Sequence, residues 1–184
     1  MMARKKRRLL LLFALAAVCL MPAAPAFGQR QKDPLTDQQV DQLRENGDNP
    51  LEKIKLYLGF IEERTTEMHR LNAASRVQNP NGLNQDTRLS SLYEEFTRIS
   101  DELDDNLDAF AQQHADMRKV LKSVVEASEK WPAVLNEPKP GGEDDFVRKT
   151  ALAAGQSVHD DAKQLLEEQE KYFSEHKTGK SGGS

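Results

Sequence analysis

The sequence has only one cysteine in 184 residues, Cys19. It lies inside a segment, residues 1–28, that we expect to be removed from the mature chain. Without a cysteine, the mature protein has no disulfide, no thiol chemistry and no thiolate metal site. The sequence also lacks a phosphate-binding glycine loop and a Gly-x-Ser-x-Gly nucleophile elbow. No catalytic residue and no cofactor are therefore predicted, and the chain is predicted not to be an enzyme.

Residues 1–28 have the layout of a secretory signal peptide. A basic run at 4–8 precedes an apolar stretch at 9–21 and a segment of small residues. Removing these residues takes away five basic and no acidic side chains, which changes the net charge from −4 to −9. The apolar run ends at Pro22, short of the ~20 residues of a membrane-spanning helix. The alternative is an uncleaved anchor. We expect an exported, periplasmic or extracellular protein with no stable membrane insertion after cleavage. Its acidity does not favour nucleic acid as a partner.

The rest of the chain reads as helix, with no alternation typical of strands. We predict a flexible lead-in at 29–35, a helical domain at 36–177 and a disordered tail at 178–184. Thr36 is expected to cap a short first helix, and a second helix is predicted from about Leu51 to Gln78. The fold prediction is all-α, an elongated antiparallel up-down bundle of three long helices plus a short N-terminal one, with coiled-coil-like packing.

A third helix is predicted from about residue 86 to Trp131, on the strength of a repeat of seven. Its first series is Leu89, Phe96, Leu103, Phe110, Met117, Val124 and Trp131. Three residues later in each repeat come Leu92, Ile99, Asn106, Gln113, Val120 and Ala127. An apolar heptad pattern of this length is typical of coiled-coil packing. Pro132 is expected to kink or end the helix.

After a Pro- and Gly-containing linker at 137–142, a last helix is predicted from about Asp144 to Lys177. Its expected buried face consists of Val147, Ala151, Ala154, Val158, Ala162, Leu165, Tyr172 and Phe173. The first half of this face has small side chains, including Gly155. We expect this half to allow a neighbouring helix to approach closely.

An acidic stretch lies in the middle of the predicted third helix. It consists of Asp101, Glu102, Asp104, Asp105 and Asp108. The interpretation that we favour is a solvated helix face. The alternatives are a docking ridge for a basic partner and a divalent-cation site. A straight helix cannot wrap the six or more oxygens that calcium takes, so the third alternative is the weakest.

The surface that we predict for contacts lies at the far end of the third helix: Val120, Val124, Trp131 and Pro132. Trp131 is the only tryptophan, and tryptophan often anchors protein contacts. The same surface could join copies of the chain in a homo-oligomer. The alternative is that Trp131 simply closes the end of the core.

Histidine and methionine pairs suggest a second class of function. Met68-His69 and His114-x-x-Met117 have side chains that can hold copper or a haem inside a bundle. No Cys-x-x-Cys-His haem-attachment run accompanies them, and no metal ligand is assigned.

Two stretches resemble known helical proteins. Leu35-Thr36-Asp37-Gln38-Gln39 resembles the LTxxQ signature of small helical periplasmic stress chaperones. The run LEKIKLYLGFIEERTTEMHRL is similar to helical extracytoplasmic domains of unknown function. Neither resemblance carries functional residues over. We therefore predict an exported, non-enzymatic interaction protein, a scaffold, adaptor or chaperone-like module, with a periplasmic metal- or haem-handling bundle as the alternative.

Overall fold

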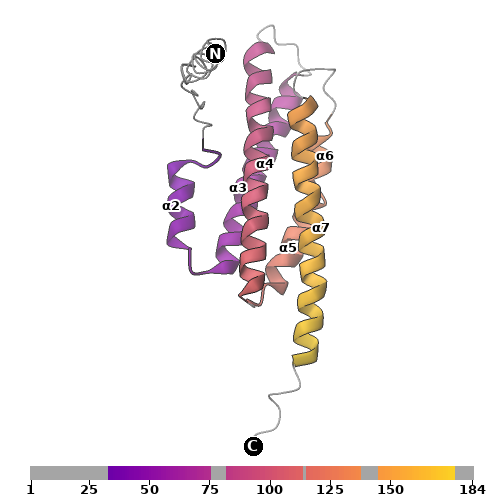
Figure 1. Cartoon of the computed structure of the whole chain (residues 1–184). Coiled ribbons are helices and arrows are strands. Elements are labelled where there is room, and N and C mark those ends of the chain that lie inside the picture. Colours follow the sequence, from indigo (N-terminus) through magenta and orange to yellow (C-terminus); the bar gives the residue numbers. More distant parts are fainter. Residues whose placement is uncertain (1–32, 76–81, 114, 138–144, 177–184) are drawn as a thin grey trace, which may run out of the picture. The chain divides into compact units, whose positions relative to one another are not determined.

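The computed structural model describes residues 33–75, 82–113, 115–137 and 145–176. These residues are all-helical, without strands, and α3 to α7 pack together as five helices (Figure 1). Among them, no helix has both the length and the apolarity needed to cross a membrane. The predicted leader at 1–28, most of the lead-in and the tail at 178–184 lie outside the described residues.

The first helix of the described chain is α2 (Asp37–Glu45), and its start agrees with the prediction. Thr36 accepts a hydrogen bond from the backbone of Gln39, and the Gln39 side chain accepts one from the backbone of Thr36. This reciprocal arrangement is a capping box, which satisfies two otherwise free backbone donors. Capping therefore accounts for two of the five residues that resemble the LTxxQ signature.

The longer helix α3 (Pro50–Ser75) runs antiparallel to α4 (Gly82–Gln112). Tyr57 contacts Glu102, and Arg64 contacts Glu95, so positions that rise along α3 fall along α4. Arg64 also donates hydrogen bonds to the Pro34 carbonyl and to Gln39. The Arg64 guanidinium on α3 therefore contacts both α4 and the segment that contains Pro34 and α2.

The prediction of one continuous third helix is wrong. The chain leaves the helix after Gln112 and starts again at Arg118, forming α5 (Arg118–Ser128) and then α6 (Trp131–Leu135). Pro132 lies in the first turn of α6, where proline is tolerated. Every residue of the predicted first heptad series is nevertheless buried. The seven-residue spacing identified core positions of three helices, α4, α5 and α6, but not the change of direction after α4.

The last helix, α7 (Asp145–Glu175), packs along α4, α5 and α6. Asp104 of α4 lies against Asp161, and Ala111 lies near Leu165, so α4 and α7 are parallel. Ser128 of α5 contacts His159 instead, whereas the earlier residue Lys122 pairs with Glu170, so α5 and α7 are antiparallel. The chain therefore reverses direction between α4 and α5, and α4 and α7 are not the antiparallel neighbours that we predicted.

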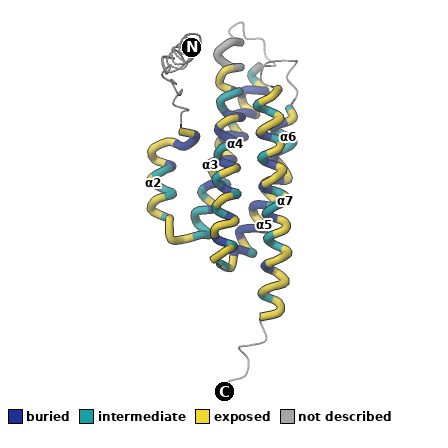
Figure 2. Tube along the Cα trace, in the orientation of Figure 1, coloured by how far each residue is buried: buried dark blue, intermediate teal, exposed yellow. Residues whose placement is uncertain are grey.

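The contact between α7 and its neighbours is close where the side chains are small, as predicted. Gly155 is buried, and a Cβ atom there would meet the Trp131 ring at 3.3 Å and the Phe96 ring at 3.4 Å. These two rings meet edge to face, with centroids 5.4 Å apart. Burial follows this contact along most of α7 and fades toward its last turns, which extend past the ends of α4 and α5 (Figures 1 and 2).

Candidate functional site

The five acidic residues of α4 do not share one surface. Asp101, Asp105 and Asp108 are exposed, whereas Glu102 and Asp104 are partly buried. Glu102 accepts a hydrogen bond from the Tyr57 hydroxyl of α3, with 3.2 Å between the oxygens. Asp104 lies against α7 instead. Three acidic residues of the stretch thus face solvent, one contacts α3 and one contacts α7.

Burial accounts for the electrostatics of the two partly buried acids. It raises the pKa of Glu102, and the hydrogen bond from Tyr57 offsets part of that change. It also raises the pKa of Asp104 to about 6, together with the nearby carboxylates of Asp161, Asp108 and Asp105. One oxygen of Asp104, Oδ1, is buried without a hydrogen-bond partner among the described residues. A carboxylate is disfavoured where water is removed and like charges gather.

The predicted contact surface lies largely inside the bundle. Val120, Val124 and Trp131 are buried, and Trp131 is only 3% exposed. Pro132 is partly exposed at the start of α6. The Trp131 ring packs on Phe96 of α4, so its partner in the structure is another helix of the same chain.

The histidine and methionine pairs are likewise separated. Met68 and Met117 are fully buried in the core, whereas the exposed His69 forms a 2.6 Å contact from Nδ1 to a Glu137 carboxylate oxygen. His114 lies outside the described residues. Within the described part of the chain, no group of three or more histidine, cysteine or acidic residues is placed to hold a metal ion.

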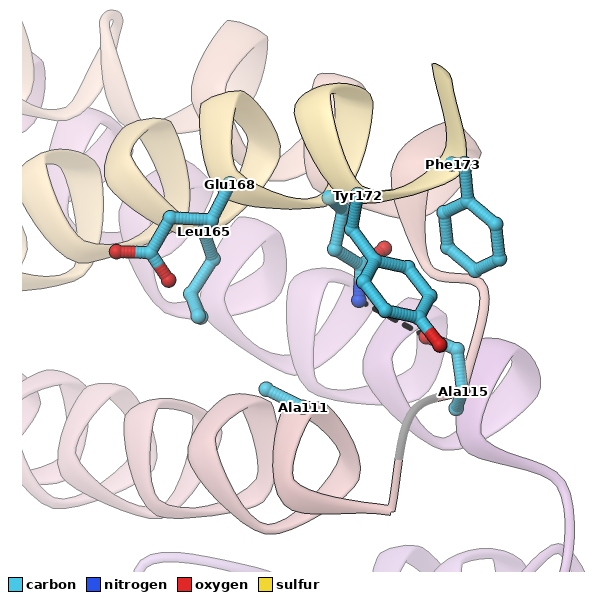
Figure 3. A pocket seen from close by; sticks show the side chains of 7 residues that line it. Ala111, Ala115, Leu165, Glu168, Tyr172 and Phe173 are labelled. Atoms are coloured by element: carbon cyan, nitrogen blue, oxygen red, sulfur yellow. Dashed lines mark hydrogen bonds between the residues drawn. The ribbon is translucent and has the colours of Figure 1, made fainter. Parts of the chain in front are cut away.

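An apolar groove lies where the end of α4 meets the last turns of α7 (Figure 3). Its volume is about 320 Å³. We refer to it as the apolar groove and define it by its lining: Ala111, Ala115, Leu165, Glu168, Gln169, Tyr172 and Phe173. Leu165 points toward Ala111, and the Tyr172 ring lies over Ala115 (Figure 3). The small side chains of Ala111 on α4 and Ala115 in the segment after it face larger ones on α7, and the hollow lies between them.

Gln169 fixes one side of this groove. Its amide nitrogen donates to the Ala115 carbonyl at 2.8 Å, and its amide oxygen accepts from the Met117 backbone N–H at 2.9 Å. Both backbone groups belong to the reversal between α4 and α5. The side chain of one α7 residue therefore replaces the helical hydrogen bonds that the reversal lacks, and it holds the groove wall in place.

The two aromatic residues of the groove are supported by neighbours. Their rings meet edge to face, with centroids 5.1 Å apart. The Arg118 guanidinium lies over the Phe173 ring, 4.4 Å from its centroid, and His176 stacks on Tyr172 at 4.2 Å. Aromatic and cation–π contacts of this kind hold rings in defined positions.

Sequence reasoning placed Tyr172 in the core, and that prediction is wrong, since its side chain is 41% exposed. The reason is length, because α7 continues past the neighbours that bury its earlier turns. The break after Gln112 carried a signal that could have located the groove. Residues 112–116 read QQHAD, and the heptad series has the polar Gln113 there.

Comparison of the chain with protein-family models, with curated proteins and with solved structures finds no match.

Proposed function

We propose that this chain is an exported, non-enzymatic helical protein that binds a protein partner through the apolar groove. The observation that carries the proposal is the aromatic pair of the exposed Tyr172 and the partly buried Phe173, beside a concave apolar wall at the end of α7. Apolar hollows with aromatic walls are the usual places where a partner side chain inserts. This site replaces the buried Val120–Trp131 region as the contact surface that we favour.

The size and polarity of the groove support a protein segment as its occupant. At about 320 Å³ it lies at the small end of ligand pockets, which suits one or two inserted side chains better than a large cofactor. Glu168 is the charged residue of its lining, and a depression lined by Asp116, Arg118, Lys119, Lys122 and Glu170 lies alongside. An apolar centre beside mixed charges is typical of protein contact sites.

In the bundle that we propose, successive helical segments run in opposite directions along the chain. α5 and α6 together form one such segment, which follows α4 and precedes α7 in the sequence. The antiparallel pairs α3–α4 and α5–α7 and the parallel pair α4–α7 support this order. It differs from the predicted order of three long helices because α5 and α6 form an additional, separate segment.

Export is supported by the layout of residues 1–28, which lie outside the described structure. Cell fractionation and N-terminal sequencing of the exported chain test this part of the proposal. We expect a mature chain that begins at Phe27 or Gln29. A full-length chain found only in the cytoplasm would contradict it.

The groove is tested by placing a photo-crosslinking amino acid at Ala111 in cells of the source organism. The matched control is Ala109, which is exposed two residues earlier on the same helix. We expect a discrete protein adduct from position 111 and none from position 109. The purified adduct partner should then bind wild-type chain in calorimetry, and Ala111→Trp, but not Ala109→Trp, should abolish binding. Equal adducts from both positions, or binding unchanged by Ala111→Trp, would rule the groove out as the site.

A further inference from the structure

One exposed aromatic residue lies at the opposite end of α7 from the apolar groove. Phe146 is in the first turn and is 78% exposed. Within the described residues, Phe146 and Tyr172 are the exposed large hydrophobic side chains. At 1.5 Å per residue they lie roughly 39 Å apart along the helix. Phe146 therefore cannot fill the groove of its own chain.

The backbone around Phe146 is held in place. Arg148 donates a hydrogen bond to Asp145 at 2.6 Å and another to Asn136, next to α6, at 3.0 Å. Lys149 also pairs with Asp145 at 2.6 Å. Because this turn is already ordered, little conformational freedom is lost when Phe146 inserts into a partner.

The groove has the size and chemistry to receive a phenyl ring. An apolar cavity of about 150 Å³ binds benzene, and the groove has a volume of about 320 Å³. The Tyr172 and Phe173 rings offer edges and faces to a third aromatic ring, which is a favourable arrangement. The alanines opposite them leave the entrance open.

Charge agrees with this pairing. Lys149 follows Phe146 by three residues and so lies on the same side of α7. Glu168 is the charged residue of the groove lining. Insertion of Phe146 would bring Lys149 toward Glu168, and opposite charges beside an apolar contact fix orientation.

We propose that Phe146 of one copy of this chain docks in the apolar groove of a second copy, and that the second copy's Phe146 docks in return. Phe146 and the apolar groove lie at opposite ends of α7. In two copies related by a two-fold axis, each Phe146 can therefore occupy the groove of the other copy, which closes the assembly as a dimer. This inference rests on the proposed function, since it names the partner of the same groove. The contact area is that of two inserted side chains and their surroundings, so the dimer should be weak, in the micromolar to millimolar range.

The test is sedimentation of the purified mature chain from about 10 μM to about 1 mM. We expect a monomer–dimer equilibrium in the wild type. Phe146→Ser and Ala111→Trp should each weaken it at least about tenfold. The matched controls, Ala153→Ser on exposed α7 surface and Ala109→Trp, should leave it unchanged.

Two further measurements separate this contact from unfolding or from other modes of dimerisation. Mixing the Phe146→Ser and Ala111→Trp chains should give a heterodimer, because one chain keeps its groove and the other keeps its phenylalanine. Lys149→Glu and Glu168→Lys should each weaken the dimer, and the double variant should regain it. Circular dichroism checks that each variant is folded.

A wild type that stays monomeric throughout, or a dimer that persists in Phe146→Ser, would overturn the inference. Different results would contradict the proposed function. They are crosslinking from position 111 that yields no partner protein, and partner binding that Ala111→Trp leaves unchanged. A monomeric chain whose groove still captures a purified foreign protein would thus overturn only the self-association.

Discussion

The carboxyl group of Asp104 in α4 lies against that of Asp161 in α7, close enough for the two groups to share a proton. A hydrogen bond between two carboxyl groups needs a proton on one of them. Burial raises the pKa of Asp104 to about 6, whereas the ordinary value is 3.8. Asp104 therefore stays protonated up to a higher pH than an ordinary aspartate, and the α4–α7 contact depends on pH through it.

The first prediction concerns the pH dependence of stability. The folded chain binds this proton more tightly than the unfolded chain does. Its stabilising effect is therefore complete below pH 3.8 and is lost as the pH rises through about 6. Asp104→Asn keeps a hydrogen-bond donor and carries no charge. Because solvent screens the pair, we expect it to raise the free energy of unfolding by about 1 kcal/mol at pH 8, with no gain at pH 4. Urea denaturation at both pH values measures this.

Asp160→Asn is the control for that experiment. Asp160 is exposed next to Asp161 and accepts a hydrogen bond from Gln156 of its own helix. Its replacement removes a charge of the same kind without touching the α4–α7 contact. A gain at pH 8 equal to that of Asp104→Asn would show that general charge repulsion, and not the carboxyl pair, controls stability.

The second prediction concerns the ion pair that joins α3 to α4. Arg64 and Glu95 are 3.0 Å apart, and the side chain of each is only 10% exposed. Glu95 also accepts hydrogen bonds from Arg88 and Ser91. Glu95→Leu removes the buried acidic partner of Arg64 and, among the described ion pairs, leaves it only Glu63, which is 63% exposed, so we expect a loss of about 3 kcal/mol in the free energy of unfolding. Chemical denaturation followed by circular dichroism gives this value.

The exposed pair Glu67–Arg70 on α3 is the matched comparison, with 2.6 Å between its charged atoms. Its geometry is as good as that of the buried pair, but its arginine is 63% exposed. Glu67→Leu should therefore cost less than about 1 kcal/mol. Similar losses for the two variants would mean that burial does not set the strength of the inner pair.

The third prediction compares two helical glycines. A Cβ atom on Gly155 would lie 3.3 Å from the Trp131 ring and 3.4 Å from Phe96, whereas one on Gly59 would meet nothing within 4 Å. Alanine improves helix propensity by about 1 kcal/mol over glycine. We expect Gly59→Ala to stabilise the chain by that amount. Gly155→Ala should destabilise it by about 1 kcal/mol, because two packed rings must shift. Thermal unfolding of both variants reports the opposite signs.

The sequence predicts the helices well because their caps and apolar spacing are local properties. Thr36 begins α2 as predicted, and the last helix, predicted from about Asp144, begins at Asp145. The error at residues 113–117 has a physical cause. This reversal contains neither glycine nor proline, and Gln169 stabilises it from a helix more than 50 residues later in the chain. A hydrogen bond from a distant helix cannot be predicted from the local spacing of apolar and polar residues.

The candidate site is harder to predict for a related reason. Exposure of Tyr172 depends on how far α7 extends past α4 and α5, and that length follows from the missed reversal. For Trp131 the sequence left two interpretations open, a contact surface on a free seam or the closed end of the core, and the structure places it against Phe96. The error in one turn of the chain therefore led to a wrong prediction for Tyr172 and left the burial of Trp131 undecided.

The last prediction tests the link between the reversal and the groove. Gln169→Leu removes the acceptor for the buried Met117 N–H and the donor to the Ala115 carbonyl. An unpaired buried donor costs about 1–3 kcal/mol, and we expect the free energy of unfolding to fall by that amount. Hydrogen exchange of the Met117 amide should accelerate more than that of amides within α4, because the reversal opens first. Gln164→Leu is the control, since the Gln164 side chain bonds only to Glu168 of its own helix in the described contacts. If the Met117 amide exchanges equally slowly in both variants, Gln169 does not hold the reversal, and the groove wall owes its position to packing alone.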